Sequence, residues 1–495
     1  MNIAFIPIDN RPVCYTLPEQ ISRLNENINL LLPDREFLGD LTKCADIENI
    51  FKWLENLQDI DAIVMCLDTV AYGGLIPSRR STDSFEQIKK RVEHLKEILI
   101  AKKAKVYAFS SIMRISNNNV NEEEKEYWNK WGKKIFNYSY CMDKFGTMCK
   151  KEVPDEILED YLETRKRNFE INKLYLSWGD FFETLVFSKD DCAEYGFNVQ
   201  EAKTLEKLGG FVKTGADEIP LTLLARAIQM IGRYEDRKIS KKNSLPSNPL
   251  TFLPSIKVAP IFLAPEHKHL ISNYEDISIE KSVLGQLELA GCKVCEPDEA
   301  DILLYVNNFE DHQGELVMNI DTKQYSGSWK EPEKPYMIAD VRFANGADNA
   351  FVEKLFKTGL NENFLGYSAW NTSANTLGSL ICGAIIKLKI RRYEDRKIGN
   401  YQKNNLPSNP PTLLSSNNNF KKLQVIRLLD DWAYQANVRQ ILRTQCPNSI
   451  KEAEEKIADL MKPFEKKVFK LFNVSYNINY KFPWNRLFEV EIELN

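Results

Sequence analysis

AIVMCLDTVAYGGLIPSRR, residues 62–80, contains the pattern that decides the fold class. An apolar run over residues 62–67 ends at Asp68, and Gly73, Gly74 and Arg79 follow within a few positions. A short run of this composition is typical of a strand that is buried on both faces of a parallel sheet. The polar residues after it are then expected at the carboxyl end of that strand.

The same pattern recurs along the chain, where short apolar runs alternate with longer amphipathic stretches. This alternation is typical of parallel strands connected by helices. The expected strands are residues 3–8, 28–32, 62–67, 105–110, 184–188, 211–213, 257–263, 302–306, 336–339 and 364–367. We therefore predict an α/β fold with mostly parallel strands, arranged either as two Rossmann-like α/β units or as an irregular barrel.

The length of 495 residues exceeds one ordinary domain. We predict an N-terminal α/β unit over residues 1–230 with a helical insertion at about 119–180, a second α/β unit over 256–391 and a helical C-terminal region over 417–495. Inserted loop repeats are expected at 231–255 and 392–416. In these segments RYEDRKI (233–239 and 392–398) and LPSNP (245–249 and 406–410) each occur twice, and the copies are basic, then rich in Ser, Asn and Pro.

Composition limits the functional classes. Hydrophobic residues make up 43% of the chain and charged residues 27%, which is typical of a globular protein. The formal net charge of −4 argues against nucleic-acid binding. No apolar stretch of about 18 residues and no basic leader is present, so no membrane segment is expected. The ten scattered cysteines fit buried thiols in a reducing cytoplasm. We expect a cytoplasmic protein that acts on a small molecule.

Polar residues collect directly after most of the expected strands. Ligands of parallel α/β folds bind outside the carboxyl ends of the strands, so these positions are candidates for substrate binding. The candidates are Asp9, Arg11, Asp68, Tyr72, Arg79, Arg114, Asn307, Asp340, Asn345, Trp370, Asn371 and Asn375. At any one position the alternative is a helix cap or a turn former, and the arginines can instead neutralise the acidic residues.

Two pairs of adjacent acids, Asp190–Asp191 and Asp217–Glu218, exceed what one helix cap requires. Two carboxyl groups close together repel as anions, so one tends to keep its proton and can act as an acid while the other acts as a base or nucleophile. Glycoside hydrolysis requires this division of roles. We predict a hydrolase of glycoside type with these four residues as catalytic candidates and no required cofactor. Trp370 and the asparagines would contact a neutral polyhydroxylated substrate, such as a carbohydrate.

Two other functions use the same residues. Asp9, Asp68 and Asp340 offer the carboxylate oxygens that Mg²⁺ or Mn²⁺ prefers, which favours a metal-dependent enzyme acting on a small acidic or phosphorylated metabolite. The third alternative is a non-catalytic protein whose two α/β units bind a small ligand. The sequence does not choose among the three.

Several motifs together resemble a known bacterial family, the domain of unknown function 4127 family. They occur in the order IDNRP (8–12), LDTVAYGGLIPSR (67–79), FSKDDCAEYG (187–196), GADE (215–218), ADVRFANGAD (339–348), YSAWNTSANTLG (367–378), LLDDWAYQ (428–435) and FPWNR (482–486). The resemblance covers nearly the whole chain apart from the two repeats. It brings no catalytic assignment, and it implies that the last two motifs pack over the site.

Overall fold

A computed structural model describes residues 1–146, 149–239, 255–403, 412–446 and 449–495. The chain divides into two compact units that interleave along the sequence. Unit 1 comprises Met1–Tyr15, Asn29–Leu223 and Tyr274–Ile277, and unit 2 comprises Thr16–Ile28, Leu224–Asn273 and Ser278–Asn495. No helix in the described ranges combines the length and the apolar character needed to cross a membrane.

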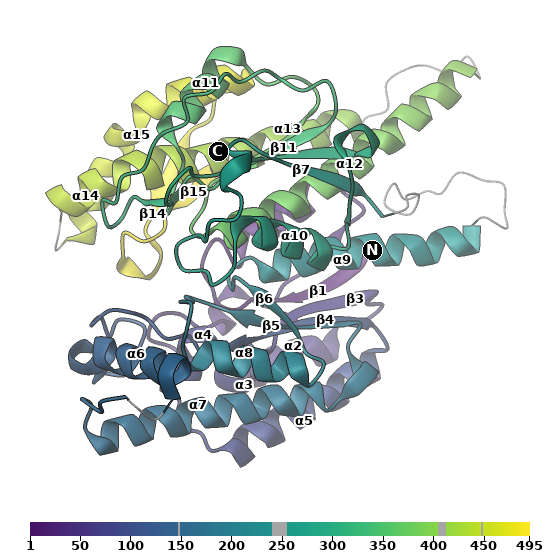
Figure 1. The fold of residues 1–495 in the computed structure, drawn as a ribbon. Coiled ribbons are helices and arrows are strands. Elements are labelled where there is room, and N and C mark those ends of the chain that lie inside the picture. Colours follow the sequence, from purple (N-terminus) through teal and green to yellow (C-terminus); the bar gives the residue numbers. More distant parts are fainter. Residues whose placement is uncertain (147–148, 240–254, 404–411, 447–448) are drawn as a thin grey trace. The chain divides into compact units, whose positions relative to one another are not determined.

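Unit 1 contains a six-stranded parallel sheet in the order β2-β1-β3-β4-β5-β6 (Figure 1). Its strands are β1 Asn2–Ile6, β2 Asn29–Leu31, β3 Ala62–Cys66, β4 Lys105–Ile112, β5 Thr184–Lys189 and β6 Phe211–Thr214. Its helices are α2 Ile47–Asn56, α3 Leu67–Tyr72, α4 Leu75–Arg80, α5 Phe85–Lys102, α6 Trp128–Phe145, α7 Asp155–Leu176 and α8 Phe197–Lys207, with 3₁₀ turns η1 Arg35–Phe37 and η3 Gly179–Phe181. Helix α9, Ile219–Ile239, begins in unit 1 and continues into unit 2.

The core of unit 1 lies between this sheet and its helices. Alternate strand residues, among them Ile6, Met65 and Ala108, pack against apolar residues of α2, α5 and α7. The intervening strand residues, such as Phe5 and Val64, are buried as well. Because residues on both faces of the sheet are buried, the strands appear in the sequence as continuous apolar runs.

Unit 2 contains a five-stranded parallel sheet in the order β13-β11-β9-β7-β8. Its strands are β7 Lys257–Phe262, β8 Lys293–Val294, β9 Ile302–Asn307, β11 Tyr336–Asp340 and β13 Phe364–Ser368, with the parallel pair β10 Gly314–Glu315 and β12 Phe343–Ala344 and the antiparallel pair β14 Ile478–Lys481 and β15 Glu491–Leu494. Its helical elements are α1 Thr16–Ser22, η5 Pro265–His267, α10 Ile279–Leu289, η6 Pro297–Glu299, α11 Asn349–Thr358, α12 Ser373–Lys403, α13 Thr412–Arg427, the π-helix η7 Leu428–Val438, α14 Arg439–Gln445, α15 Ile450–Phe472 and η8 Pro483–Asn485.

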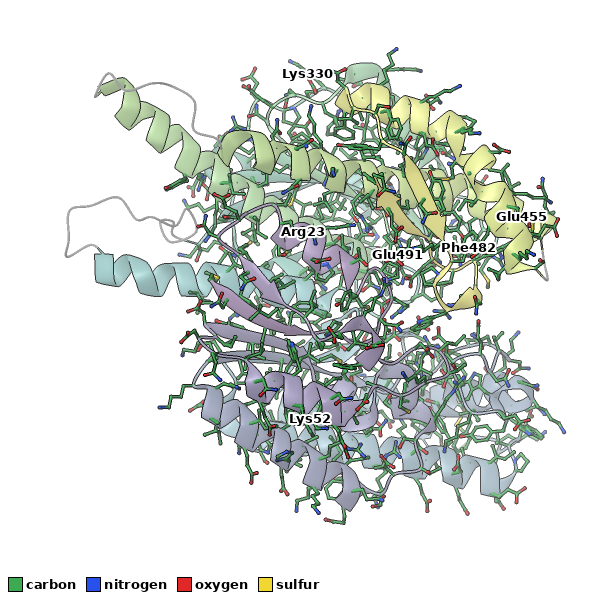
Figure 2. All side chains as sticks on the ribbon, turned by 180° about the vertical axis from the view of Figure 1, so that it is seen from behind. Arg23, Lys52, Lys330, Glu455, Phe482 and Glu491 are labelled. Atoms are coloured by element: carbon green, nitrogen blue, oxygen red, sulfur yellow. A yellow bond between two sulfur atoms is a disulfide. The ribbon has the colours of Figure 1, made fainter. Side chains whose placement is uncertain are left out.

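Helix α1 belongs to unit 2 although it comes early in the sequence. It packs on α12 and α13, and Thr16 Oγ1 donates to Glu491 of β15 at 2.9 Å. Asn419 of α13 donates to the backbone oxygen of Arg23 just after α1, at 2.7 Å. Figure 2 labels Arg23 and Glu491 on these segments.

The structure confirms the α/β class with mostly parallel strands, the helical insertion and the mainly helical C-terminal part. The strands form two open sheets, and not the barrel that was the alternative. In each sheet the first strand in sequence, β1 or β7, lies between the second and the third, so each unit has one topological switch point.

The expectation of loops at the two repeats is wrong for their first halves. Helix α9 extends through residues 233–239, and α12 extends through 392–398. RYEDRKI contains good helix formers and neither Gly nor Pro, so nothing in it ends the preceding helix. The LPSNP copies at 245–249 and 406–410 lie outside the described residues.

Candidate functional site

The carboxyl ends of the strands in unit 1 carry a cluster of arginines and carboxylates. Asp9 and Arg11 follow β1, Arg114 follows β4, and Asp217 follows β6. We call the full set the arginine–carboxylate cluster, and it comprises Asp9, Arg11, Arg79, Arg114, Glu123, Glu124, Asp190, Asp191 and Asp217. It includes seven of the residues predicted from the sequence.

Arg11 connects the loop that follows β1 to the loop that follows β6, the last strand of the sheet. Its Nε donates to both carboxylate oxygens of Asp9, at 3.0 and 2.9 Å, and its Nη2 forms an ion pair with Asp217. Burial raises the pKa of Asp217, Arg11 opposes this shift and Asp9 adds to it. One guanidinium therefore pairs with two buried carboxylates.

Arg114 is the centre of the second part of the cluster. Its guanidinium lies 2.8 Å from Glu123, 3.1 Å from Glu124, 3.1 Å from Asp191 and 3.5 Å from Asp190. Four carboxylates around one arginine leave an excess of negative charge. That excess favours protonation of one of them.

Asp190 is the carboxyl that takes the proton. Burial and the neighbouring charge of Asp191 raise the pKa of Asp190 to about 7, against the effect of Arg114. Asp217 is a further negative neighbour, which links the two parts of the cluster electrostatically. A carboxyl group with this pKa can donate or accept a proton near neutral pH.

The loop that carries the two aspartates is fixed at both ends. Lys189, the last residue of β5, forms a buried ion pair with Asp276 at 2.5 Å, and the Cys192 N–H donates to the backbone oxygen of Tyr274 at 2.9 Å. Asp191 itself has φ +44°, in the left-handed region that non-glycine residues seldom adopt. Strained residues of this kind often lie at functional sites.

Arg79 reaches the cluster because helix α3 ends after six residues. Gly73, at φ +91°, ends α3, and its N–H bonds to the carbonyls of Asp68 and Thr69. A second short helix, α4, then carries Arg79 back to Glu123 and Glu124, at 3.5 and 3.6 Å.

The Arg79 side chain is only 1% exposed, and its Nε and Nη1 find no hydrogen-bond acceptor among the described residues. Buried donors nearly always have an acceptor, either in the protein or in something bound to it.

Three predicted residues of unit 1 have other roles. Asp68 accepts from the Ser111 N–H at 2.8 Å and from Ser110 Oγ at 3.3 Å, so it joins β3 to β4, and burial raises its pKa to about 6. Tyr72 packs in the hydrophobic core, which argues against substrate contact. Glu218 is fully buried just before α9.

Two predicted residues of unit 2, Asn307 and Asp340, belong to a fully buried network. Asn307 Nδ2 donates to Asp340 at 2.8 Å, and Arg342 Nε donates to Asn307 Oδ1 at 3.1 Å. Tyr367 and the Asp348 N–H both donate to the other oxygen of Asp340, at 2.9 Å. Burial and the nearby Asp348 raise the pKa of Asp340 to about 7. These contacts join β9, β11 and β13 and leave no side chain exposed to a ligand.

The remaining predicted residues of unit 2 lie in loops or, for Asn375, at the start of a helix. The Asn345 N–H donates to the Asn371 carbonyl at 2.9 Å, and both residues have φ near +60°. Trp370 is buried edge-on against Phe488, with ring centroids 6.4 Å apart. Asn375 is buried in the first turn of α12.

The two C-terminal motifs pack onto these loops. Asp431 accepts from the Ala369 N–H and Tyr434 donates to the Leu487 carbonyl, at 2.6 and 2.7 Å, so LLDDWAYQ and the segment after FPWNR border the end of β13.

The metal-binding set expected from the sequence draws on both units, since Asp9 and Asp68 belong to unit 1. Asp68 is engaged by the two serines, and Asp340 belongs to unit 2. Among the described residues, Asp9, Cys14 and Asp217 do bring one ligand atom each to within 4.8 Å of one another. Arg11 already provides positive charge at this place, so a cation there would compete with its guanidinium.

Sequence reasoning missed three residues of the candidate site in unit 1. Glu123 and Glu124 stand in the run EEEKE, which looks like the start of a solvated helix, and Cys14 looks like an ordinary buried thiol. The position of EEEKE shortly after the strand-end motif SSIMR was the available signal.

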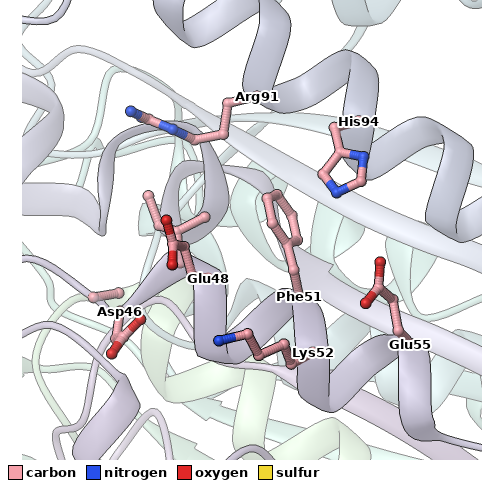
Figure 3. Close-up of a pocket in the computed structure, with 9 residues that line it drawn as sticks. Asp46, Glu48, Phe51, Lys52, Glu55, Arg91 and His94 are labelled. Atoms are coloured by element: carbon pink, nitrogen blue, oxygen red, sulfur yellow. The ribbon is translucent and has the colours of Figure 1, made fainter.

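A separate pocket of about 640 Å³ lies between α2 and α5 of unit 1 (Figure 3). Phe51 and His94 meet edge to face in it, with ring centroids 5.1 Å apart, and Lys52, Glu48 and Arg91 add charge of both signs. Its lining includes none of the residues predicted from the sequence.

The profile of a family described as "Protein of unknown function (DUF4127)" matches residues 3–493. The chain belongs to the DUF4127 family. No curated protein matches the chain. The match spans residues of both units.

Proposed function

We propose that this DUF4127 protein is a hydrolase of glycoside type, with Asp190 and Asp191 as its catalytic pair. The observation that supports this most is that two adjacent carboxyl groups contact the same arginine but have different surroundings. Asp190 holds a proton up to about pH 7 because it is buried beside the charge of Asp191. Asp191 pairs more closely with Arg114, at 3.1 Å against 3.5 Å.

In this mechanism Asp190 donates its proton to the glycosidic oxygen as the bond from that oxygen to the anomeric carbon breaks. The Asp191 carboxylate forms a bond to the anomeric carbon from the other side. Water then attacks that carbon, its proton passes to the Asp190 carboxylate, and the bond to Asp191 breaks. Both carboxylates contact the same Nη1 of Arg114, which favours the separation of about 5–5.5 Å used by retaining enzymes over the about 6.5–9.5 Å of inverting enzymes.

The test is a panel of 4-nitrophenyl and unactivated alkyl glycosides with wild type, Asp190→Asn, Asp191→Asn and the control Asp160→Asn. With the 4-nitrophenyl substrates, whose leaving group needs no proton, Asp190→Asn should release a burst of about one 4-nitrophenol per enzyme and then turn over slowly, because the base of the second step is missing. With the alkyl glycosides it should show no reaction. Asp191→Asn should lose activity on both, and the exposed Asp160 should make no difference. Absence of turnover by the wild type on the whole panel would rule the proposal out.

The metal-dependent alternative rests on Asp9, Cys14 and Asp217. In that case Mg²⁺, Mn²⁺ or Zn²⁺ would replace Arg11 between the carboxylates, and Arg11 would hold an acidic or phosphorylated substrate. A metal that binds the folded state raises its melting temperature. Equal melting curves with each ion and with EDTA, for wild type and Asp217→Asn alike, would exclude this alternative.

A cytoplasmic location is proposed on the basis of the cysteines. Among the described residues, five cysteines that form no disulfide are buried: Cys14, Cys66, Cys192, Cys382 and Cys446. Cys141 and Cys149 form a disulfide in the helical insertion. Cell fractionation followed by thiol labelling tests the location and the redox state of this pair together.

A further inference from the structure

Helix α8 begins directly after the loop of the proposed catalytic pair, and it begins without a cap of its own. Its N-cap residue is Gly196, which has no side chain to accept from the N–H groups at the helix start. Helix α6 provides the acceptors, since Asp143 accepts from the Gly196 N–H at 2.9 Å and Ser139 Oγ accepts from the Phe197 N–H at 2.8 Å. The start of α8 therefore depends on the end of α6, which packs against it (Figure 1).

Two further contacts join α6 to the same loop. The rings of Tyr140 and Tyr195 meet edge to face, with centroids 5.3 Å apart, and Lys144 Nζ lies 5.0 Å from the centre of the Tyr195 ring. The ion pair of Asp276 with the end of β5 holds the first end of the loop 190–196. Helix α6 holds its second end.

A disulfide closes the part of α6 that makes these contacts. Cys141 lies between Ser139 and Asp143 along the helix, and it is bonded to Cys149, which comes before α7. The bond ties the last turns of α6 to the segment that follows the helix. Helix ends fray when nothing holds them. Both cysteines are partly exposed, so the bond is accessible to a reductant.

We propose that the Cys141–Cys149 disulfide is a redox switch of the candidate site, which fixes the loop 190–196 when it is formed and loosens that loop when it is reduced. The switch regulates the site described under the proposed function, and it rests on that function only for its effect on turnover. In the cytoplasm, which we propose as the location, the few disulfides that form are usually transient and often sense the redox state.

The switch requires a dithiol as the reductant. One thiolate of the dithiol attacks a sulfur of the pair, the Cys141–Cys149 bond breaks, and a mixed disulfide forms. The second thiol of the reductant then attacks the mixed disulfide and releases the protein thiol. Two electrons and two protons pass to the two cysteines, and the dithiol becomes a disulfide. Without the bond the last turn of α6 frays, and α8 loses the acceptor that Asp143 provides.

Hydrogen exchange measured by mass spectrometry on the full chain, before and after reduction with dithiothreitol, tests the switch. Peptides that contain the Gly196 and Phe197 amides should exchange about tenfold faster or more after reduction, because these N–H groups lose their acceptors. Peptides of α5 in the same unit should not change.

Two cysteine variants separate this disulfide from the other thiols. Cys141→Ser combined with Cys149→Ser should exchange like the reduced wild type and should not respond to dithiothreitol. The matched control is Cys44→Ser, which removes an exposed cysteine that forms no disulfide, and it should respond like the wild type.

A capping variant tests the route from the disulfide to the loop. Ser139→Ala combined with Asp143→Ala removes both acceptors and leaves the cysteines in place. The same peptides should then exchange fast in both redox states, and reduction should add little.

The proposal is overturned if thiol titration shows that the pair does not form under mild oxidation, or if the oxidised and reduced wild type exchange alike at Gly196 and Phe197. It is also overturned if the double cysteine variant still responds to dithiothreitol, if the capping variant responds like the wild type, or if an active wild type hydrolyses glycosides equally in both redox states. A wild type that is inactive on every glycoside but whose exchange responds to reduction would reject the proposed hydrolysis and support the switch.

Discussion

Arg114 Nη1 lies 3.1 Å from Asp191 Oδ2, and the same guanidinium contacts three further carboxylates. Arg114→Met should lower the free energy of unfolding by about 3 kcal/mol at pH 8, because buried carboxylates lose their counter-charge. The loss should be smaller at pH 5, where the carboxyl groups take up protons. Urea denaturation measures both values.

Lys89→Met is the matched control for that variant. Lys89 and Glu93 form an exposed pair along α5 at 4.0 Å, and its loss should change the free energy of unfolding by less than about 0.5 kcal/mol. Equal effects of the two substitutions would show that Arg114 is not the counter-charge of the cluster.

The titration of Asp190 should depend on Asp191. With ¹³C-labelled aspartate, NMR should show a carboxyl midpoint near pH 7 in the wild type that Asp190→Asn removes. In Asp191→Asn the midpoint should fall, because the largest of the neighbouring charges that raise the pKa is gone. An Asp190 midpoint near the ordinary value of about 4 in the wild type would contradict this prediction.

The titration of Asp190 should also make the stability of the folded protein depend on pH. The folded protein binds the Asp190 proton more tightly than the unfolded chain, so this group makes stability fall as pH rises from about 4 to 7. In Asp190→Asn the free energy of unfolding should therefore decrease less between about pH 4 and 7 than in the wild type.

Lys189 and Asp276 should behave as a coupled buried pair. Each side chain is 9% exposed, so Lys189→Met or Asp276→Asn alone leaves a buried charge and should cost about 3 kcal/mol. The double variant should cost less than the sum of the two, and a double-mutant cycle in urea measures the difference. Additive losses would mean that the two charges are not paired in solution.

Gly346 should tolerate no side chain. A Cβ there would lie 2.6 Å from Leu316 Cδ1 and 3.0 Å from the backbone nitrogen of Ala436, and its φ is +145°. Gly346→Ala should therefore lower the free energy of unfolding by more than about 2 kcal/mol, because backbone strain and overpacking both contribute. Gly359, at φ +90° with no described atom within 4 Å of its Cβ position, provides the control. Gly359→Ala should cost about 1 kcal/mol in thermal unfolding, from backbone strain alone.

The main strands were predictable because they are buried on both faces and therefore read as continuous apolar runs. All ten expected strands are present. Strands β8, β10 and β12 have two residues each, too few to carry a pattern. The alternation in EVEIEL was visible and predicts β15, but it was assigned to a helical region.

The site was predictable where a residue directly follows a strand, as Asp9, Asp190 and Asp217 do. Tyr72 lies further from the end of its strand, β3, and the short helix α3 places it in the core. Glu123 and Glu124 were not predictable as partners of Arg114, because a tertiary contact gives them that role and their local sequence is that of a solvated segment. Nothing in LLDDWAYQ signals a π-helix. This conformation is rare, and we attribute it here to tertiary packing, which the local sequence does not show.

The segment Tyr274–Ile277 comes from the second half of the sequence but belongs to unit 1, where its Asp276 holds the end of β5. Helix α1 makes the opposite exchange, so the chain changes unit five times. A gene cut once between the halves would encode two incomplete fragments, each lacking a piece that the other carries. We therefore expect neither half to fold correctly when it is produced without the other.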